Sequence, residues 1–429
     1  MKLALFALSV FGYYFAIQFG ALNYLFCQTF ATGVFHEIDY DFIWTAKVGL
    51  FIASTLNFLP TKIEKASEMF FFCLYLFVYI PAIAFIGAEV NPRYIPLAIS
   101  FTCGVIVIGL TTRLSPVNCS SMSKVPKQIM DVMLTCFIVI FVILFVRYYS
   151  ILNITSLENT YQQREIGKAD TWYLGYAQTY FVFFFSAFIL SAGLFERKFL
   201  LIVLGCFGFL FMYAITAERT TVVAPVVIKL IHNNRYRLRC GLNLVTLFLV
   251  FLSIVIVAVS LFYDRYPLIN EIGFYFFTRP IATPGKFVLD YHDFFAANGL
   301  TYFSHVKGFN LIVPTPDVYK WNPHWPSLGW IVGNDFHQID SNSNASFVST
   351  DGLASIGVGG VFLMCLVFSI FLLYLDKFSK RIPSELVITS TFPIAFALTN
   401  GSLFTTLLSY GGFAVLILFY QISKAQPRV

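Results

Sequence analysis

The 429-residue sequence has very little charge: Asp, Glu, Lys and Arg make up 12% of it, about half the share found in soluble domains. Hydrophobic residues make up 58%, so the polar residues are too few to cover a water-facing globule. The apolar residues come in runs of about 20, the length that crosses a bilayer as a helix. The sequence therefore predicts an all-α, polytopic integral membrane protein. A β-barrel is not supported, because runs such as "LTCFIVIFVILFV" do not alternate.

Patterns for metal, cofactor and nucleic-acid binding are also missing. The eight cysteines form no CxxC pair and lie mostly in apolar runs, which indicates packing rather than a disulfide framework or a zinc site. There is no HExxH, P-loop, GxSxG or Rossmann glycine pattern, and no basic patch that suggests nucleic acid. We therefore predict no metal, no cofactor and no nucleic-acid partner.

The apolar runs suggest about twelve membrane spans. They lie at about 2–26, 43–60, 68–89, 93–113, 129–149, 173–194, 198–216, 219–233, 242–263, 350–375, 384–400 and 403–423. We expect the first run to be a retained span rather than a removed signal peptide, because it extends past 20 residues without a clear cleavage site.

Basic residues predict the orientation of these spans. With a cytoplasmic N-terminus, the inside segments hold 16 of the 28 Lys and Arg residues in very little sequence. The short outside segments hold few; "QTFATGVFHEIDYD" has none. The span at 219–233 is the weakest, but omitting it would put the basic "DKFSKR" outside. Both termini are therefore predicted to be cytoplasmic.

A large outside loop divides the chain into three parts: a transmembrane bundle at 1–263, the loop at 264–349, and further spans at 350–429. The loop holds seven of the 17 prolines, three of the five tryptophans and four of the six histidines. Long loops without structure or function are uncommon, so we expect it to be folded.

Within the loop, "TPGKFVLDYHDFFAANG" carries helix signals. Thr283 can act as the N-cap, Pro284 suits the first helical position, and Asn298–Gly299 suits the C-terminus. Aromatic and aliphatic residues recur at helical spacing between them. We predict a short amphipathic helix that lies on the membrane surface or closes over a cavity between spans.

Ionisable residues are almost absent from the predicted spans. Lys47 alone lies well inside one, and snorkelling or a helix contact would explain it. Asp131 and Asp351 both lie at span ends. Ion-coupled transporters usually need carboxylates near the bilayer midplane, so the distribution of charge disfavours a transporter.

Three arginines stand at predicted outer boundaries: Arg219, Arg265 and Arg279. Each needs an anionic partner there, and Glu218, Asp264 and Glu271 respectively offer simple salt bridges. Gathered around one outer cavity, the three arginines would instead make a site for a diphosphate, because each guanidinium group can bind two phosphate oxygens at once.

The loop also offers general bases and sugar-binding groups. Imidazole titrates near neutral pH, so any of the four histidines in the loop can serve as a base, although a single histidine is more often structural. They are His292, His305, His324 and His337. The stretch "YKWNPHWPSLGW" suits stacking on sugar rings or, more commonly, an interfacial aromatic belt.

Three stretches resemble the Wzy-type oligosaccharide repeat-unit polymerases: "FFTRPIATPGKFVLDYHDFF", "SNSNASFVSTDGLASIGVGGVFL" and "LTNGSLFTTLLSYGGFAVL". They resemble, in order, the family's Arg–x–Pro–Gly segment with its aromatic helix, its Asn-Ala-Asn-rich segment before a glycine-containing span, and its final hairpin. The dominant late periplasmic loop is also similar. The extra basic residue Arg265 departs from the pattern.

The resemblance implies a metal-independent glycosyltransferase of the bacterial inner membrane. Such enzymes move a growing glycan from undecaprenyl diphosphate to the non-reducing end of a lipid-linked repeat unit, on the periplasmic side; a chain-length regulator is a further expected partner. We expect Arg279, Arg219 and His337 to be catalytic. The residues expected to bind substrate are Arg265, Tyr291, His292, His324, Asn342, Asn344 and Asp351.

The stretch "SNSNASF" would then line a polar cavity for glycan hydroxyls. Ordinary helix capping by Ser349 or Thr350, with Asp351 in the first turn, is the simpler alternative.

Two other functions stay open at this point. An O-antigen ligase uses the same donor but transfers to lipid A-core. A flippase or lipid-linked sugar transporter would instead need a polar tunnel that opens alternately to both faces.

Overall fold

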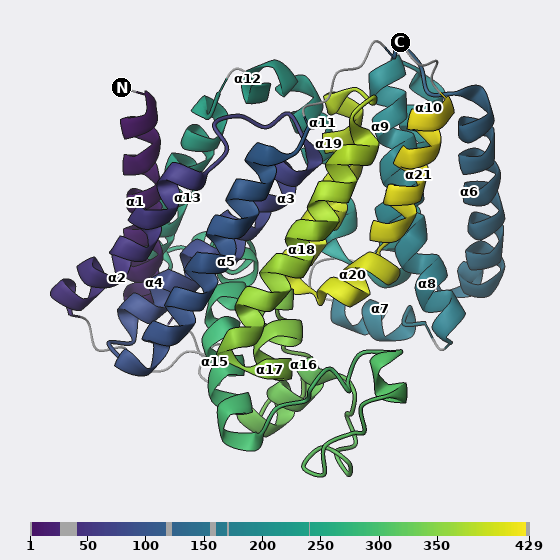
Figure 1. The fold of residues 1–429 in the computed structure, drawn as a ribbon. Coiled ribbons are helices and arrows are strands. Elements are labelled where there is room, and N and C mark those ends of the chain that lie inside the picture. The colour runs from purple at the N-terminus through teal and green to yellow at the C-terminus, as the bar shows by residue number, and fades with distance from the viewer. Residues whose placement is uncertain are drawn as a thin grey trace.

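The computed structural model describes residues 2–25, 41–116, 122–154, 160–169, 171–239 and 241–425, and no strand occurs among them. The outside segment predicted at 28–41 lies almost entirely beyond the described residues. Most helices run roughly along one direction; α1 (Lys2–Gly20) begins and α21 (Gly412–Ala425) ends at the same end of the bundle (Figure 1). The predicted all-α class is confirmed.

Eight helical stretches among the described residues are long and apolar enough to cross a membrane. They are Ala4–Leu25, Ala66–Ala88, Pro92–Leu114, Lys127–Ile151, Trp172–Glu196, Phe199–Thr216, Asn243–Phe262 and Val358–Ser379. This pattern is that of a polytopic membrane protein.

The other four predicted spans form shorter helices. They are α2 (Phe42–Thr55), α11 (Arg219–Asn233, with Pro225 inside it), α19 (Ser384–Ala397), and α20 (Leu403–Leu408) followed by α21. The span predicted at 403–423 is formed by two helices. The chain turns between α20 and α21 at Gly411, whose φ of +86° lies in the left-handed region that glycine tolerates.

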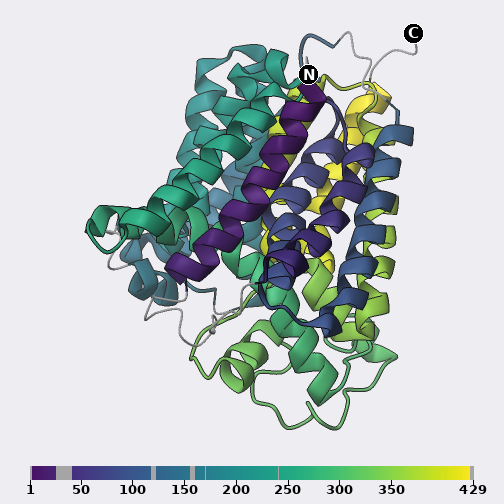
Figure 2. The ribbon, with the colours of Figure 1, turned by 90° about the vertical axis from the view of Figure 1, so that its left-hand side faces the viewer.

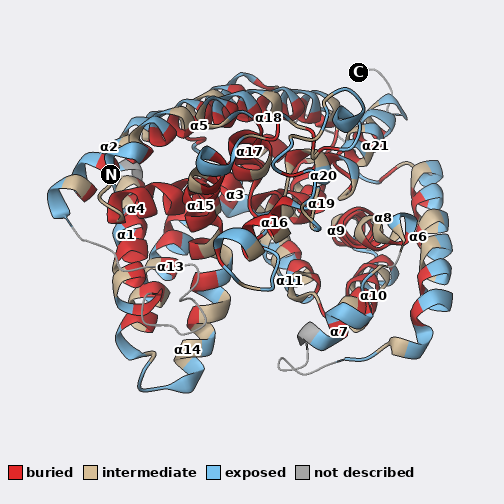
Figure 3. Ribbon diagram, turned by 90° about the horizontal axis from the view of Figure 1, so that it is seen from below, coloured by how far each residue is buried: buried red, intermediate tan, exposed pale blue. Residues whose placement is uncertain are grey.

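Burial separates the central helices from the outer ones. The stretch containing α3 (Ala66–Leu74) and α4 (Ile80–Ala88) is 94% buried, whereas the one containing α6 (Lys127–Tyr148) is 22% buried. Figure 3 shows α6 at the edge with its outer side exposed. Val139 and Ile143 of α6 are exposed, as expected for apolar side chains that lie against lipid.

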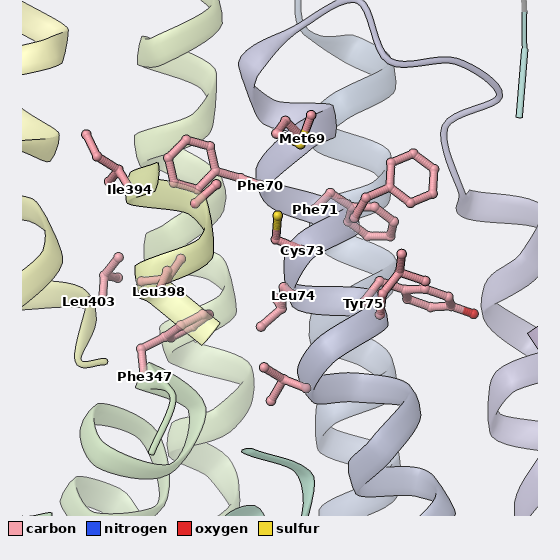
Figure 4. Packing of buried hydrophobic residues seen from close by; sticks show 14 of the residues in the cluster. Met69, Phe70, Phe71, Cys73, Leu74, Tyr75, Phe347, Ile394, Leu398 and Leu403 are labelled. Atoms are coloured by element: carbon pink, nitrogen blue, oxygen red, sulfur yellow. The ribbon is translucent and has the colours of Figure 1, made fainter. Parts of the chain in front are cut away.

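Aromatic and aliphatic side chains pack around α3 at the centre. Phe70 of α3 points toward Ile394 of α19, and Leu398 and Leu403 lie nearby (Figure 4). The rings of Phe70 and Phe368, from α18 (Val358–Ser379), meet edge to face with centroids 6.0 Å apart. Each such contact stabilises the fold only slightly, but many of them together contribute a large stabilising energy.

A continuous helix of three parts opens the large loop: α14 (Pro267–Gly273), the π-helical η9 (Phe274–Ala282) and α15 (Thr283–Asn298). The predicted helix at 283–298 therefore exists and ends where predicted, but the helix begins sixteen residues earlier, at Pro267. Thr283 is not its N-cap, however, because the chain is already helical before it. At the other end Gly299, with φ of +95°, terminates the helix as expected.

Two positions are predicted for this helix, on the membrane surface or closing over a cavity between spans, and its burial does not fit the first of them. Ten of its first thirteen residues are buried, and it packs against α4. A Cβ atom on Gly285 would lie 2.4 Å from the Cβ of Pro81, so only glycine permits this close approach. Its aromatic residues, which suggest an interfacial face by spacing alone, are core residues.

The segment from 299 to 347 follows as turns and short helices, including α16 (Leu328–Ile331). It lies at the end opposite the start of α1 (Figure 2). Lys168, in the connection before α8 (Trp172–Tyr180), has its Nζ 5.8 Å from the centre of the Trp330 ring, so this connection meets the 299–347 segment. The run predicted as one span at 350–375 is broken at Gly357, which separates η12 (Val348–Leu353) and α17 (Ala354–Ile356) from α18.

Candidate active site

Arg219 and Arg279 lie over two adjacent aromatic rings. The guanidinium carbon of Arg219, at the start of α11, is 4.3 Å from the centre of the Tyr275 ring. That of Arg279 is 5.1 Å from the centre of the Phe274 ring. Asn270 and Glu271 join these rings in lining an open cavity of about 310 Å³. Cation–π contacts thus hold both predicted catalytic arginines close to one cavity wall.

Lys286 forms a buried ion-pair network that the sequence-based analysis missed. Its Nζ lies 2.5 Å from Asp290 Oδ1, one turn along α15, and 3.0 Å from Glu89 Oε1 beyond the end of α4. Burial alone would lower the pKa of Lys286, but the charges of Asp290 and Glu89 outweigh it and raise that pKa above its ordinary value. The lysine is therefore charged and bridges two carboxylates.

His337 completes this network. Its Nε2 lies 3.1 Å from Asp290 Oδ2 and its Nδ1 2.9 Å from Ser343 Oγ. The side chain is 1% exposed, and the ring of Phe287 stacks on it. Both nitrogens are thus engaged by the protein, so His337 in this geometry positions the loop against α15 and has no nitrogen open to a substrate.

Other predicted substrate-binding residues surround the same segment. The buried Tyr291 donates its hydroxyl hydrogen to the Ser343 carbonyl at 3.0 Å. Asn342 and Asn344 are exposed on either side of Ser343. Tyr291 is therefore structural in this geometry, whereas the two asparagines remain accessible to a ligand.

His292 belongs to a second polar cluster, next to the first on α15. Its Nδ1 lies 3.0 Å from Asp293 Oδ1, while Asp293 Oδ2 accepts hydrogen bonds from Arg93 at 2.6 Å and Tyr94 at 2.7 Å. Burial by itself raises the pKa of Asp293, but the hydrogen bonds from His292 and Tyr94 and the charge of Arg93 lower it overall. The cluster ties the loop end of α15 to the start of α5 (Ile95–Leu114).

The last two predicted residues of the loop lie apart from these clusters. Arg265 is exposed between α13 (Asn243–Phe262) and α14. The ring of His324 stacks on Trp330 with centroids 5.8 Å apart. Neither contributes to the buried polar networks.

Asp351 is a fully buried carboxylate at the break between loop and span. Oδ1 accepts from Ser402 Oγ at 2.8 Å, and Oδ2 accepts from the backbone N–H of Leu403 at 2.5 Å. His305 Nε2 lies 3.9 Å from Oδ1. Asp351 therefore caps α20. The alternative that Ser349 or Thr350 caps the helix at this point is wrong, because both lie inside η12, although Asp351 does lie in its first turn. The hydroxyl of Ser349 has no hydrogen-bond partner.

The structure does not gather the predicted catalytic residues into one tight group. Arg279 precedes Asp290, the partner of His337, by eleven residues on a continuous helix, or roughly 16 Å along its axis. The two arginines share one wall, whereas His337 belongs to the Lys286 network. Among the described residues, no three His, Cys, Asp or Glu side chains come together in a way that could hold a metal ion.

One signal for the missed network was present in the sequence. Lys286 and Asp290 are four residues apart within an apolar helix, the spacing of an ion pair on one face. The third partner, Glu89, is distant in sequence, so no local pattern points to it. Comparison with protein families, curated proteins and solved structures finds no match to this chain.

Proposed function

We propose that the chain is an inner-membrane glycosyltransferase that polymerises lipid-linked oligosaccharide repeat units. It would move a growing glycan from undecaprenyl diphosphate to the non-reducing end of a fresh unit. In this proposal the bundle has twelve spans, both termini are cytoplasmic, and the 299–347 segment faces the periplasm.

The observation that carries the proposal is the pair of arginines beside one open cavity. Arg219 and Arg279 come from distant parts of the chain, yet they lie over Tyr275 and Phe274, both of which line that cavity. A diphosphate leaving group gains charge as its bond to the sugar breaks. Two positioned guanidinium groups stabilise that charge, which lowers the barrier of the transfer.

The helix that carries the cavity wall also exposes apolar side chains. Tyr266, Leu268 and Phe276 are exposed on α14, η9 and the turn before them. Exposed apolar side chains on this helix suit contact with the polyprenyl chain of such a donor. Asn342 and Asn344, exposed in the loop, offer amides for sugar hydroxyls.

A deletion strain tests the proposed function most directly. Surface glycans limited to a single repeat unit support a polymerase. Lipid-linked polymer that is never attached to lipid A-core would instead indicate a ligase. Lipid-linked units retained on the cytoplasmic face would indicate a flippase.

The purified protein provides the second test. Incubated with a lipid-diphosphate-linked repeat unit, it should form polymer in the presence of EDTA, because the proposed chemistry uses arginines in place of a divalent cation. Activity that EDTA abolishes and magnesium or manganese restores would contradict metal independence.

A further inference from the structure

The short helix α12 (Arg235–Arg239) carries three arginines that face two ways. Arg235 and Arg239 are one turn apart and both line a small pocket, whereas Arg237, on the other side of the helix, does not. Leu238 of the same helix is buried, and its carbonyl accepts a hydrogen bond from the Ile63 backbone N–H at 3.0 Å. These contacts hold α12 against the bundle in one orientation.

The pocket has more positive charge than its carboxylate can neutralise. Glu385 of α19 is shared by two partners: its Oε1 lies 2.7 Å from His232 Nδ1, and its Oε2 lies 2.8 Å from Arg235 Nε. Among the described residues, no carboxylate lies within ion-pair distance of Arg239. Two guanidinium groups thus face one carboxylate, so at least one positive charge remains.

The pocket is small and its wall is largely aliphatic. Its volume is about 10 Å³, enough for one water-sized group. Ile231, Leu238 and Ile388 form much of the wall. A single phosphate oxygen has this size and the opposite charge. The rest of such an anion would lie at the mouth of the pocket, beside the exposed Arg239.

The helix that leads to this pocket exposes an apolar ridge. Val222, Val226 and Leu230 of α11 are exposed and follow one another at four-residue spacing, so they share one face of the helix. The rest of α11 packs against α10 (Phe199–Thr216) and α19. The ridge ends one residue before Ile231 of the pocket wall. An acyl chain along it would therefore bring its headgroup to Arg239.

The length of α11 places the pocket at the depth of lipid headgroups. Its 15 residues span about 22 Å, less than the roughly 30 Å of a hydrocarbon core. A span this short is accommodated by thinning of the bilayer and by flanking cationic side chains that extend toward the headgroups. α12 begins two residues after α11 ends, at the end of the bundle where α1 begins (Figure 1). Its arginines therefore lie where lipid phosphates lie.

We propose that the pocket between α11, α12 and α19 binds an anionic phospholipid. The phosphate pairs with Arg239 and Arg235, and an acyl chain lies along Val226 and Leu230. A guanidinium group binds two phosphate oxygens at once, and cations at a membrane surface attract anionic lipids. The remaining positive charge favours a headgroup that carries the phosphate charge alone over one that also carries an ammonium group. The site is independent of the proposed function, since a bilayer lipid binds whatever reaction the protein catalyses.

Native mass spectrometry of the purified full-length protein tests the site. The probes are phosphatidylglycerol and phosphatidylcholine with identical acyl chains, added at equal concentration. We expect the wild type to retain more phosphatidylglycerol, and Arg239→Gln to reduce this preference about fivefold. Arg237→Gln is the matched control, because it removes the same charge from the other side of the same helix and should keep the preference. Phosphatidylglycerol should also raise the thermal midpoint of the wild type more than that of Arg239→Gln.

Each other outcome contradicts the proposal. Equal retention of the two lipids by the wild type would refute it, as would an unchanged preference in Arg239→Gln. Equal losses in Arg237→Gln and Arg239→Gln would show a diffuse attraction to the basic surface in place of a site. Inorganic phosphate that raises the midpoint as much as phosphatidylglycerol would show a site for free phosphate and no lipid. The ratio of bound lipids is read from folded protein, so partial unfolding of a variant does not change its meaning.

Discussion

His337 Nε2 and Asp290 Oδ2 lie 3.1 Å apart although the two residues are 47 positions apart in sequence. This contact and the Tyr291–Ser343 hydrogen bond tie the irregular segment at 299–347 to α15. The loop is therefore held to the bundle by buried polar contacts as well as by apolar packing.

Replacing His337 should loosen this attachment. His337→Ala leaves Asp290 Oδ2 and Ser343 Oγ without this partner inside the protein, which costs about 1–3 kcal/mol for each buried group left unsatisfied. We expect faster proteolysis of 299–347 and a lower thermal midpoint. His324→Ala serves as the comparison, since its ring only stacks on Trp330. Equal protease resistance of wild type and His337→Ala would contradict the positioning role.

Lys286→Met should be strongly destabilising. The methionine fills a similar volume but leaves the buried Asp290 and the partly buried Glu89 without the cation between them. Breaking a buried ion pair in this way costs on the order of 3–5 kcal/mol. Thermal unfolding in detergent measures it, with the exposed Lys307→Met as control. Similar midpoints for the two variants would show that the network adds little to stability.

The charged carboxylate of Asp293 should stabilise the folded protein in a way that is lost in acid. Its pKa in the folded protein is lowered, so its contribution is present above the unfolded value of about 3.9 and is lost as pH falls through the folded pKa. Because Arg93 is half exposed, we expect Asp293→Asn to cost only about 1 kcal/mol at pH 7.

This difference between wild type and Asp293→Asn should shrink as the pH falls below about 4. Thermal midpoints at several pH values measure it, with the exposed Asp317→Asn as control. A difference that stays constant with pH would show that the charge of Asp293 is not responsible.

Arg219 and Arg279 should tolerate neither alanine nor lysine if they bind the donor diphosphate. Losing one such contact should slow polymer formation roughly a hundredfold or more, equivalent to about 2–4 kcal/mol. Lysine should rescue poorly, because a point charge cannot bind two phosphate oxygens as a guanidinium does. Arg237→Ala, exposed on α12 (Arg235–Arg239), is the control. Full-length polymer from normally expressed Arg279→Ala would refute the assignment.

Topology can be tested without any assay of activity. Reporter fusions after Arg239 should indicate the cytoplasm, and fusions within 300–340 the periplasm. This follows from the positive-inside rule and from the position of these segments at opposite ends of the bundle (Figure 1). The same compartment for both fusions would contradict twelve spans.

The sequence was sufficient for the class of protein and for most helix positions, because long apolar runs specify membrane helices directly. It predicted the C-terminal end of α15 but neither the helical residues before Thr283 nor the burial of α15, which depends on Gly285 meeting Pro81, 204 residues earlier. It also marked Arg219 and Arg279 as boundary charges. It could not show that His337 is enclosed or that Asp351 caps α20, because Asp290 and Ser402 are brought there only by tertiary packing.

The continuous helix from Pro267 to Asn298 places Arg279, Lys286 and His292 on one rod roughly 48 Å long. A rod of this kind moves as a unit except where it bends, and Pro280 within η9 is the natural hinge. Pro280 lies between Arg279 and Asp290, so a bend there would absorb a displacement of η9 before it reached α15. The cavity wall with its arginine and the loop held by Asp290 are therefore attached to opposite sides of one hinge.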